Sequence, residues 1–225
     1  MTGSGTERAT TDARGERLAD RSGERPVSGS ETLHHGIVVD LVRDQVDFAP
    51  GVSFDREYVR HPGAVAVLAL DEDDRVLLIR QYRHPAAATL WELPAGLLDH
   101  GGEAPHLAAR RELREETDHD ATTWHTLVDV RSSPGGSDEV VRVYLAGGLT
   151  AEAEAGFERA EEEAEIQQRR VPLDEVVDAV LAGDLTNATL VAGILALAAV
   201  RSRPEGRQRL RAADVPFPTR REPRD

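Results

Sequence analysis

The 225-residue sequence contains no cysteine and no lysine, so all of its permanently charged basic side chains are arginines. The absence of cysteine excludes a disulfide framework, a zinc–thiolate site and a cysteine nucleophile. The absence of lysine excludes a P-loop phosphate site and Schiff-base chemistry. The chain also lacks a Gly-x-Ser-x-Gly nucleophile elbow and a His-Glu-x-x-His motif, which argues against acyl-enzyme and zinc-protease chemistry.

Long hydrophobic runs are absent as well. The longest, Ala188–Val200, spans thirteen residues, whereas a membrane-spanning helix needs about 20. The run therefore predicts a buried helix, and Asn187 in front of it is a favourable N-cap residue. The first 30 residues are polar and lack the apolar segment of a secretory signal. We expect a cytoplasmic protein that does not bind membranes.

Acidic residues outnumber basic ones, giving a net charge of −14 and a pI near 5.0. Binding to a nucleic-acid backbone requires a basic surface, so no nucleic-acid partner is expected. A small anionic substrate remains compatible with this charge if a metal ion and nearby arginines screen its phosphate groups.

Acidic side chains are concentrated in Glu103–Thr117, where helical spacing places Glu112, Glu115 and Glu116 on one side. Each like-charge pair destabilises an exposed helix by roughly 0.2–0.5 kcal/mol, and by more where water is excluded. A divalent cation offsets this repulsion, and oxygen ligands favour a hard ion such as Mg²⁺ or Mn²⁺. The alternative is a solvated acidic face whose charge is balanced by Arg110, Arg111 and Arg114.

The segment Gly96–His119 resembles the Nudix box, written Gly-x5-Glu-x7-Arg-Glu-U-x-Glu-Glu-x-Gly-U with U an aliphatic residue. The metal-binding half is matched in full by Glu103, seven residues, and then the run Arg111–Glu116. Six residues instead of five separate Gly96 from Glu103, and the glycines in that loop should absorb the extra one.

Asp118 and His119 stand where the box has glycine and an aliphatic residue. The position after a helix favours the left-handed backbone conformation, which is why glycine is common there. Aspartate tolerates this conformation better than most residues. We therefore expect a modest cost in stability and an intact site.

Outside the box, the chain resembles the ADP-ribose pyrophosphatase branch of the Nudix family. Pro134 stands at the distance past the box where those relatives carry a proline, within a segment, Ser132–Glu139, that reads as a turn. The phrases Gln81–His84 and Trp91–Gly96 also resemble this branch. The likeness extends over about residues 60–201.

The sequence predicts an α/β fold, in which a mixed sheet with helices on both faces forms a Nudix-type α/β/α sandwich, plus a short N-terminal β segment. The resemblance implies that this N-terminal segment, with strands at Gly36–Val42 and Ser53–Val59, serves a homodimer. The predicted organisation is a disordered tail at 1–30, the β segment at 31–60, the Nudix domain at 61–202 and a flexible tail at 203–225. Within the domain we expect strands at Ala64–Leu70, Val76–Ile79, Thr123–Val130, Val140–Leu145 and Ile166–Val171, and helices at Leu173–Ala182 and Ala188–Arg201.

The resemblance also implies roles for individual residues. The metal ligands are expected to be the main-chain carbonyl of Ala95 and the side chains of Glu112, Glu115 and Glu116, with Glu115 also counted among the catalytic residues. Arg111 is expected to pair with a neighbouring carboxylate and orient it.

The acidic run before Ile166 occupies the place where relatives carry the general base, which makes Glu162 or Glu163 the candidate; the alternative is a solvated loop. For the substrate, Arg83 could hold a phosphate with two hydrogen bonds. Glu92 and Glu139 could accept hydrogen bonds from ribose hydroxyls or from the base.

Taken together, these features predict metal-dependent hydrolysis of the pyrophosphate of ADP-ribose to AMP and ribose 5-phosphate. One alternative is another nucleoside diphosphate sugar or a dinucleotide as substrate, because the box recognises the pyrophosphate and not its appendages. A second alternative is a Nudix module that binds a nucleotide without hydrolysing it, as a sensor.

Overall fold

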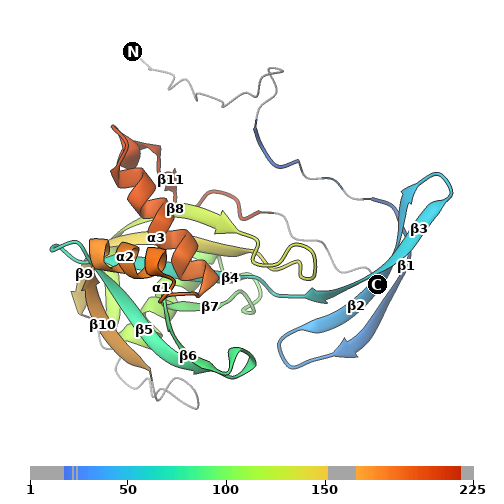
Figure 1. The fold of residues 1–225 in the computed structure, drawn as a ribbon, viewed down its shortest axis with the longest axis horizontal. Helices are drawn as coiled ribbons and strands as arrows, with labels where there is room; N and C mark the ends of the chain where they lie inside the picture. Colours follow the sequence, from blue (N-terminus) through green and yellow to red (C-terminus); the bar gives the residue numbers. More distant parts are fainter. Residues whose placement is uncertain (1–17, 22, 24, 152–165, 219–225) are drawn as a thin grey trace.

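A computed structural model of the chain describes residues 18–21, 23, 25–151 and 166–218, and within these ranges it contains two β-sheets and three α-helices. A three-stranded N-terminal sheet stands to one side of an eight-stranded sheet that carries the helices (Figure 1). No helix in the described part of the chain is long and apolar enough to cross a bilayer.

The N-terminal sheet is an antiparallel meander of β1 (Val27–His35), β2 (Asp40–Ala49) and β3 (Val52–Arg60). The sequence predicted only two strands here and a disordered tail to residue 30, whereas β1 is a third strand that begins at Val27, inside the predicted tail. Main-chain pairing and polar contacts hold β1 in place, such as the hydrogen bond from Ser30 Oγ to Asp44 Oδ1 at 2.6 Å. Its sequence therefore lacks the apolar alternation from which a strand could have been predicted.

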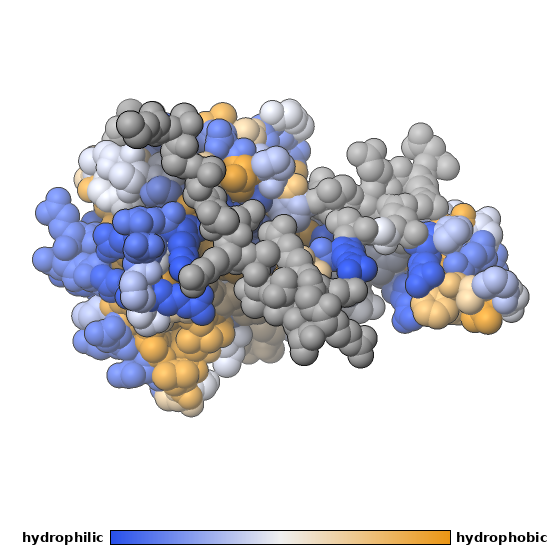
Figure 2. Space-filling view, turned by 90° about the horizontal axis from the view of Figure 1, so that it is seen from above, coloured by the Kyte–Doolittle hydropathy of each residue, from blue (hydrophilic) through white to orange (hydrophobic). Residues whose placement is uncertain are grey.

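Apolar side chains remain exposed on the β2–β3 hairpin, and Figure 2 shows hydrophobic surface on the projecting sheet. Phe48 and Val52 are each 50% exposed, and the rings of Phe48 and Phe54 lie 5.8 Å apart. This surface, which we call the hairpin patch, is separate from the core of the main domain.

The main sheet grows from the predicted hairpin of β4 (Ala64–Leu70) and β5 (Arg75–Arg83). Its strand order is β10-β5-β4-β9-β8-β11, in which β4 and β9 run parallel while the other neighbours are antiparallel. The sheet is therefore mixed, as expected. Its further elements are η1 (His84–Ala86), β6 (Ala88–Glu92), β7 (Ala95–Leu97), β8 (His119–Val130), β9 (Val141–Ala151), β10 (Gln167–Pro172) and β11 (Arg211–Ala212).

Helices cover both faces of this sheet, which confirms the α/β/α sandwich. On one face, α1 (Pro105–Thr117) packs its buried alanines and Leu113 against Val65 and Val67 of β4. On the other face, α2 (Leu173–Ala182) and α3 (Ala188–Arg201) pack against Ala66 and Leu68. Strand β4 is buried on both sides, so its sequence is a continuous apolar run instead of an alternating one.

The chain beyond residue 203 is not a loose tail over its described part, which corrects that prediction. It forms a 3-10 turn, η3 (Gly206–Arg209), and then β11, which pairs with β8 at the edge of the sheet. The guanidinium of Arg142, whose side chain is 1% exposed, donates to the carbonyl oxygens of Val215 and Pro216 at 2.7 and 2.8 Å. The segment thus covers a buried cation.

Asp129 completes this ion cluster, because it accepts hydrogen bonds from Arg142 and Arg211 at 2.6 and 2.7 Å. Burial alone would raise the pKa of Asp129, but the two arginines lower it below its ordinary value. The carboxylate therefore stays ionised and neutralises Arg142 inside the protein.

We predict that Asp129→Asn lowers the free energy of unfolding by about 3 kcal/mol, because it leaves the Arg142 cation buried without a counter-charge. The measurement is urea unfolding of the full chain. Glu57→Gln is the matched control, since it removes an equivalent carboxylate from an exposed pair with Arg43 on the N-terminal sheet. Equal effects of the two substitutions would contradict the assigned role of Asp129.

Candidate active site

The acidic helix α1 begins at Pro105 and ends at Thr117, where Asp118 adopts the left-handed conformation with φ 57° and ψ 34°. The Asp118 N–H donates to the carbonyl oxygen of Arg114 at 2.9 Å, which closes the last turn. The box position that usually holds glycine is thus occupied by an aspartate in the conformation expected from the sequence. The helix end keeps its shape.

Gly96, which follows Ala95 on β7, lies against the carboxylate of Glu112. A Cβ atom added at residue 96 would come within 1.9 Å of the Glu112 carboxyl carbon and within 2.4 Å of both its oxygens. Only glycine leaves this space, so the glycine that opens the box is required by the approach of a side chain and not by a turn.

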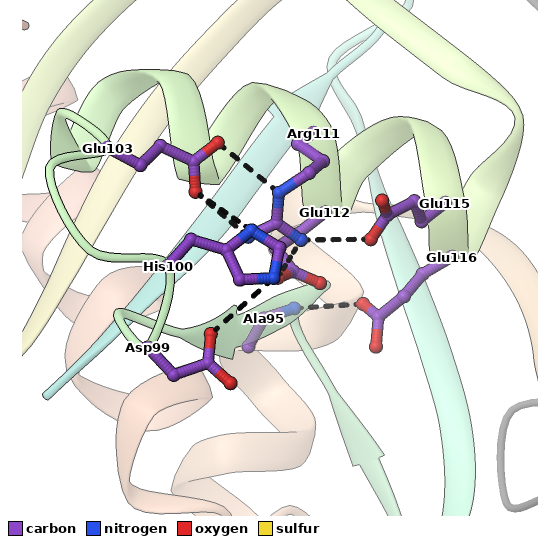
Figure 3. A network of polar contacts seen from close by, with 8 residues as sticks. All are labelled: Ala95, Asp99, His100, Glu103, Arg111, Glu112, Glu115 and Glu116. Carbon is purple, nitrogen blue, oxygen red and sulfur yellow. Dashed lines mark hydrogen bonds and ion pairs between the residues drawn. The ribbon is translucent and has the colours of Figure 1, made fainter. Parts of the chain in front are cut away.

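A second carboxylate lies beside the same main-chain segment. Glu116 is 5% exposed, and its Oε2 accepts a hydrogen bond from the N–H of Ala95 at 2.9 Å (Figure 3). Glu112 and Glu116 are one helical turn apart and both face β7. The structure therefore brings together Ala95, Glu112 and Glu116, three of the residues predicted to hold a metal ion.

Arg111 lies among the carboxylates of the box, as Figure 3 shows. Its guanidinium donates to Glu103 at 3.0 Å, to Glu112 at 2.6 Å and to Glu115 at 3.0 Å. Burial alone would lower the pKa of Arg111, but these three carboxylates raise it above its ordinary value. The Arg111 hydrogen bond in turn lowers the pKa of Glu103. Arg111 therefore orients several carboxylates at once.

The remaining two arginines of α1 point away from this cluster. Arg110 and Arg114 each approach Asp120 of β8 to 2.5 Å, and Asp120 is 3% exposed. Burial alone would raise the pKa of Asp120, but hydrogen bonds from Arg110, the Ala121 N–H and Arg114 lower it to about 2. The solvated-face alternative is wrong, because Glu112 and Glu116 are buried and two of the three arginines serve a different carboxylate.

The charge balance of the box cluster favours a cation. Glu103, Glu112, Glu115 and Glu116 contribute four negative charges and Arg111 one positive charge, which leaves a net charge of −3 in this group. All side-chain donors are carboxylate oxygens, which suit a hard divalent ion. The residues present therefore fit a metal ion.

Within the described ranges, no three acidic or histidine side chains alone form a metal-binding group. Glu112, Glu116 and the Ala95 carbonyl are the groups that would hold the ion. The full predicted ligand set of Ala95, Glu112, Glu115 and Glu116 stays a prediction, and Arg111 bonds to both Glu112 and Glu115.

Two residues predicted to contact the substrate pair with each other. The Arg83 guanidinium donates to Glu92 at 2.7 Å, and Gln81 Nε2 donates to the same carboxylate at 3.3 Å. Glu92 is 4% exposed, so it orients Arg83. Leu77 lies on the sheet face that α1 covers, and side chains alternate along β5, so Ile79 and Arg83 lie on that face too. Glu92 pairs with Ile79 and therefore shares the face. Both residues stay predictions as substrate contacts.

Glu139 lies on the loop between β8 and β9, in contact with Ser132 and 3.6 Å from Nε2 of His61. The turn predicted around Pro134 is present, since the Gly136 N–H donates to the carbonyl oxygen of Ser133 at 2.9 Å. The structure thus places Glu139 beside the β3–β4 connection, whereas Arg83 and Glu92 come from the β5–β6 pair. Glu162 and Glu163 lie outside the described residues.

Sequence reasoning missed Asp120 and Gln168, which both hold α1 in place. Asp120 binds two arginines of the helix, and Gln168 Nε2 donates to the main-chain oxygen of Glu116 at 3.1 Å. Neither residue belongs to the box, and each meets the helix only through the fold.

Comparison with known proteins identifies the fold family: residues 59–192 match the NUDIX domain. The chain belongs to the Nudix family. Nudix hydrolases generally need a divalent metal ion, in keeping with the carboxylates around Ala95 and Gly96.

Individual relatives are similar over most of their length. The chain is 49% identical over 172 residues to an ADP-ribose pyrophosphatase of Mycobacterium tuberculosis, covering 76% of this chain and 82% of the relative. It is 39% identical over 130 residues to an ADP-ribose pyrophosphatase of Bacillus subtilis (58% and 70% covered). It is also 40% identical over 126 residues to a methanol dehydrogenase activator of Bacillus methanolicus (56% and 68%).

A solved structure supports the fold. The crystal structure of an ADP compounds hydrolase superposes with a TM-score of 0.66 at 24% identity, covering 80% of this chain and 96% of that one. At this identity the likeness shows the fold alone.

We predict that Gly96→Ala weakens divalent-metal binding roughly 10- to 100-fold, because the new methyl group displaces the Glu112 carboxylate. The fold should persist, since the methyl group meets only the end of a flexible side chain. Titration calorimetry with Mn²⁺, alongside thermal unfolding, measures both quantities. Gly101→Ala is the control because a Cβ there meets open space; unchanged Mn²⁺ affinity in the Gly96 variant would contradict the prediction.

Proposed function

We propose that this protein hydrolyses the pyrophosphate bond of ADP-ribose, giving AMP and ribose 5-phosphate. The observation that carries the proposal is the buried pair of Glu112 and Glu116 against the main chain of Ala95–Gly96. The similarity to two ADP-ribose pyrophosphatases supports ADP-ribose as the substrate.

In the proposed reaction, a water oxygen bonds to one phosphorus atom, the bridging P–O bond breaks, and each product leaves as a phosphate monoester. The difficulty is electrostatic, because the negative oxygens of the pyrophosphate repel a nucleophile. Glu112, Glu116 and the Ala95 carbonyl would hold a divalent ion, whose positive charge would offset this repulsion. Mg²⁺ is the proposed ion, with Mn²⁺ as a substitute.

The protein's own residues orient the reacting groups. Arg111 holds Glu112 and Glu115 in one arrangement, while the Ala95 N–H holds Glu116. Arg83, whose guanidinium is oriented by Glu92, is proposed to bind a phosphate oxygen. Glu139 is proposed as an acceptor for a ribose hydroxyl or the base. Glu162 or Glu163 is proposed as the general base that accepts the proton of the attacking water.

The N-terminal sheet is proposed to mediate a homodimer. The hairpin patch exposes Phe48, Val52 and Phe54 on a sheet that projects from the domain, beside a depression of about 580 Å³ that Phe48 and Val52 help to line. Covering apolar surface of this kind with a second copy removes it from water, which stabilises the dimer. We also propose that the protein works in the cytoplasm on a small nucleotide substrate.

We predict that the wild-type protein with Mg²⁺ converts ADP-ribose to AMP and ribose 5-phosphate, and that Glu116→Gln lowers kcat by at least about 100-fold. Glutamine keeps the size of the side chain and its contact with Ala95 but loses the charge that binds metal. Product chromatography over a panel of nucleotide sugars and dinucleotides measures substrate choice. Faster turnover of another panel member would replace ADP-ribose, and tight binding without any turnover would favour a sensor.

The general base is tested by changing the two candidates one at a time. We expect one of Glu162→Gln and Glu163→Gln to lower kcat by roughly 100-fold or more, as loss of a proton acceptor does, and the other to change it little. Steady-state kinetics across pH with saturating Mg²⁺ gives the comparison. Two small effects would mean that the base lies elsewhere in the chain.

A further inference from the structure

The carbonyl groups of the last turn of α1 have no N–H donor within the helix, as at any helix C-terminus. Two of them are bound by side chains from outside the helix. The Glu116 carbonyl oxygen accepts a hydrogen bond from Gln168 Nε2 at 3.1 Å, and the Thr117 carbonyl oxygen accepts one from His119 Nδ1 at 2.5 Å. The end of the metal-binding helix is therefore capped by side chains.

The proton positions on His119 follow from its two partners. Arg170 can only donate, and its Nη2 lies 2.7 Å from His119 Nε2, so Nε2 is the acceptor. The Thr117 carbonyl can only accept, so Nδ1 carries the proton. Arg170 thereby orients the imidazole toward the helix end. Its own Nη1 lies 3.9 Å from Asp71.

Gln168 and Arg170 reach the helix because they share one face of β10. They are two residues apart on an edge strand and pair with Ile79 and Leu77 of β5, and Leu77 lies in the core that α1 covers. Ile79 in turn pairs with Glu92 on its other side. Gln168 of β10, Ile79 of β5 and Glu92 of β6 therefore form one row across three strands. The row connects the residue that contacts the end of α1 to the carboxylate that orients Arg83.

Glu116 is thus held at both of its ends. Gln168 fixes its main-chain carbonyl, while the Ala95 N–H fixes its carboxylate at 2.9 Å. A shift of the helix end would move the carboxylate relative to Ala95 and Glu112, because the side chain has little freedom at 5% exposure. The geometry of the metal ligands depends on a strand that contributes no ligand of its own.

We propose that Gln168 is a positioning residue for the metal-ligating Glu116, with His119 and Arg170 capping the same helix end in support. This inference rests on the proposed metal-dependent hydrolysis. Gln168 itself touches neither metal nor substrate in this assignment; it acts through the backbone of residue 116.

The test compares Gln168→Glu with Gln167→Glu. Both add one negative charge to β10, but Gln167 pairs with Arg80, whose guanidinium lies over the Trp91 ring on the opposite face of the sheet. Glutamate at 168 has the same length, lacks a donor and points an oxygen at the Glu116 carbonyl. Gln168→Met is a second variant that removes the donor without adding charge, which separates positioning from a general charge effect.

For Gln168→Glu and Gln168→Met we expect kcat to fall about tenfold and the Mg²⁺ concentration for half-maximal rate to rise about tenfold, as for other outer-shell partners of metal ligands. KM for ADP-ribose at saturating Mg²⁺ should stay within about twofold, since no substrate contact is lost. Gln167→Glu should match the wild type in all three quantities. A purely structural role would lower thermal stability without moving the Mg²⁺ requirement.

Mn²⁺ binding by calorimetry provides a readout that needs no turnover. Weaker Mn²⁺ binding by both Gln168 variants, with unchanged binding by Gln167→Glu, supports the inference even if the wild type hydrolyses no nucleotide, in which case only the proposed function fails. Gln168 variants that bind Mn²⁺ and turn over as Gln167→Glu does would overturn the inference while leaving the proposed function intact.

Discussion

The contact on which the site depends is the approach of the Glu112 carboxylate to the backbone at Gly96. It requires α1 to lie so close to β7 that no side chain fits at residue 96. The apolar face of the helix enforces this closeness, because Leu113 and the buried alanines pack directly on β4. Small alanines at this interface let the helix approach the sheet, and the carboxylates on its flank are carried to the main chain of Ala95 and Gly96.

Repulsion among the carboxylates is the cost of this arrangement, and the three arginines of α1 differ in how they bear on it. Arg111 screens the flank that faces β7 but leaves that group net negative. Arg110 and Arg114 neutralise the buried Asp120 on the other side of the helix. If all three had faced the carboxylates, their charge would have removed the reason for a metal ion to bind. The distribution of the arginines over the helix surface is therefore as important as their number.

Much of the fold could be predicted from the sequence where apolar pattern and local capping agree. Helices at Leu173–Ala182 and Ala188–Arg201 have the expected bounds, and Asn187 caps the second by accepting from the Leu190 N–H at 3.0 Å. The strands that escaped prediction, β1, β6, β7 and β11, are short or polar and are held through main-chain pairing. Because every residue type offers the same backbone groups, such pairing leaves little trace in the sequence.

The sequence by itself determined which carboxylates lie on one side of α1 and that Asp118 ends the helix, because helical periodicity and backbone conformation are local properties. It could not reveal that Arg83 pairs with Glu92, that Arg110 and Arg114 turn to Asp120, or that Gln168 caps the metal-binding helix. Nor could it reveal that the segment after residue 203 covers Arg142. Only the tertiary structure decided these contacts, since each joins residues whose separation along the chain carries no information until strand order and helix placement bring them within hydrogen-bonding distance.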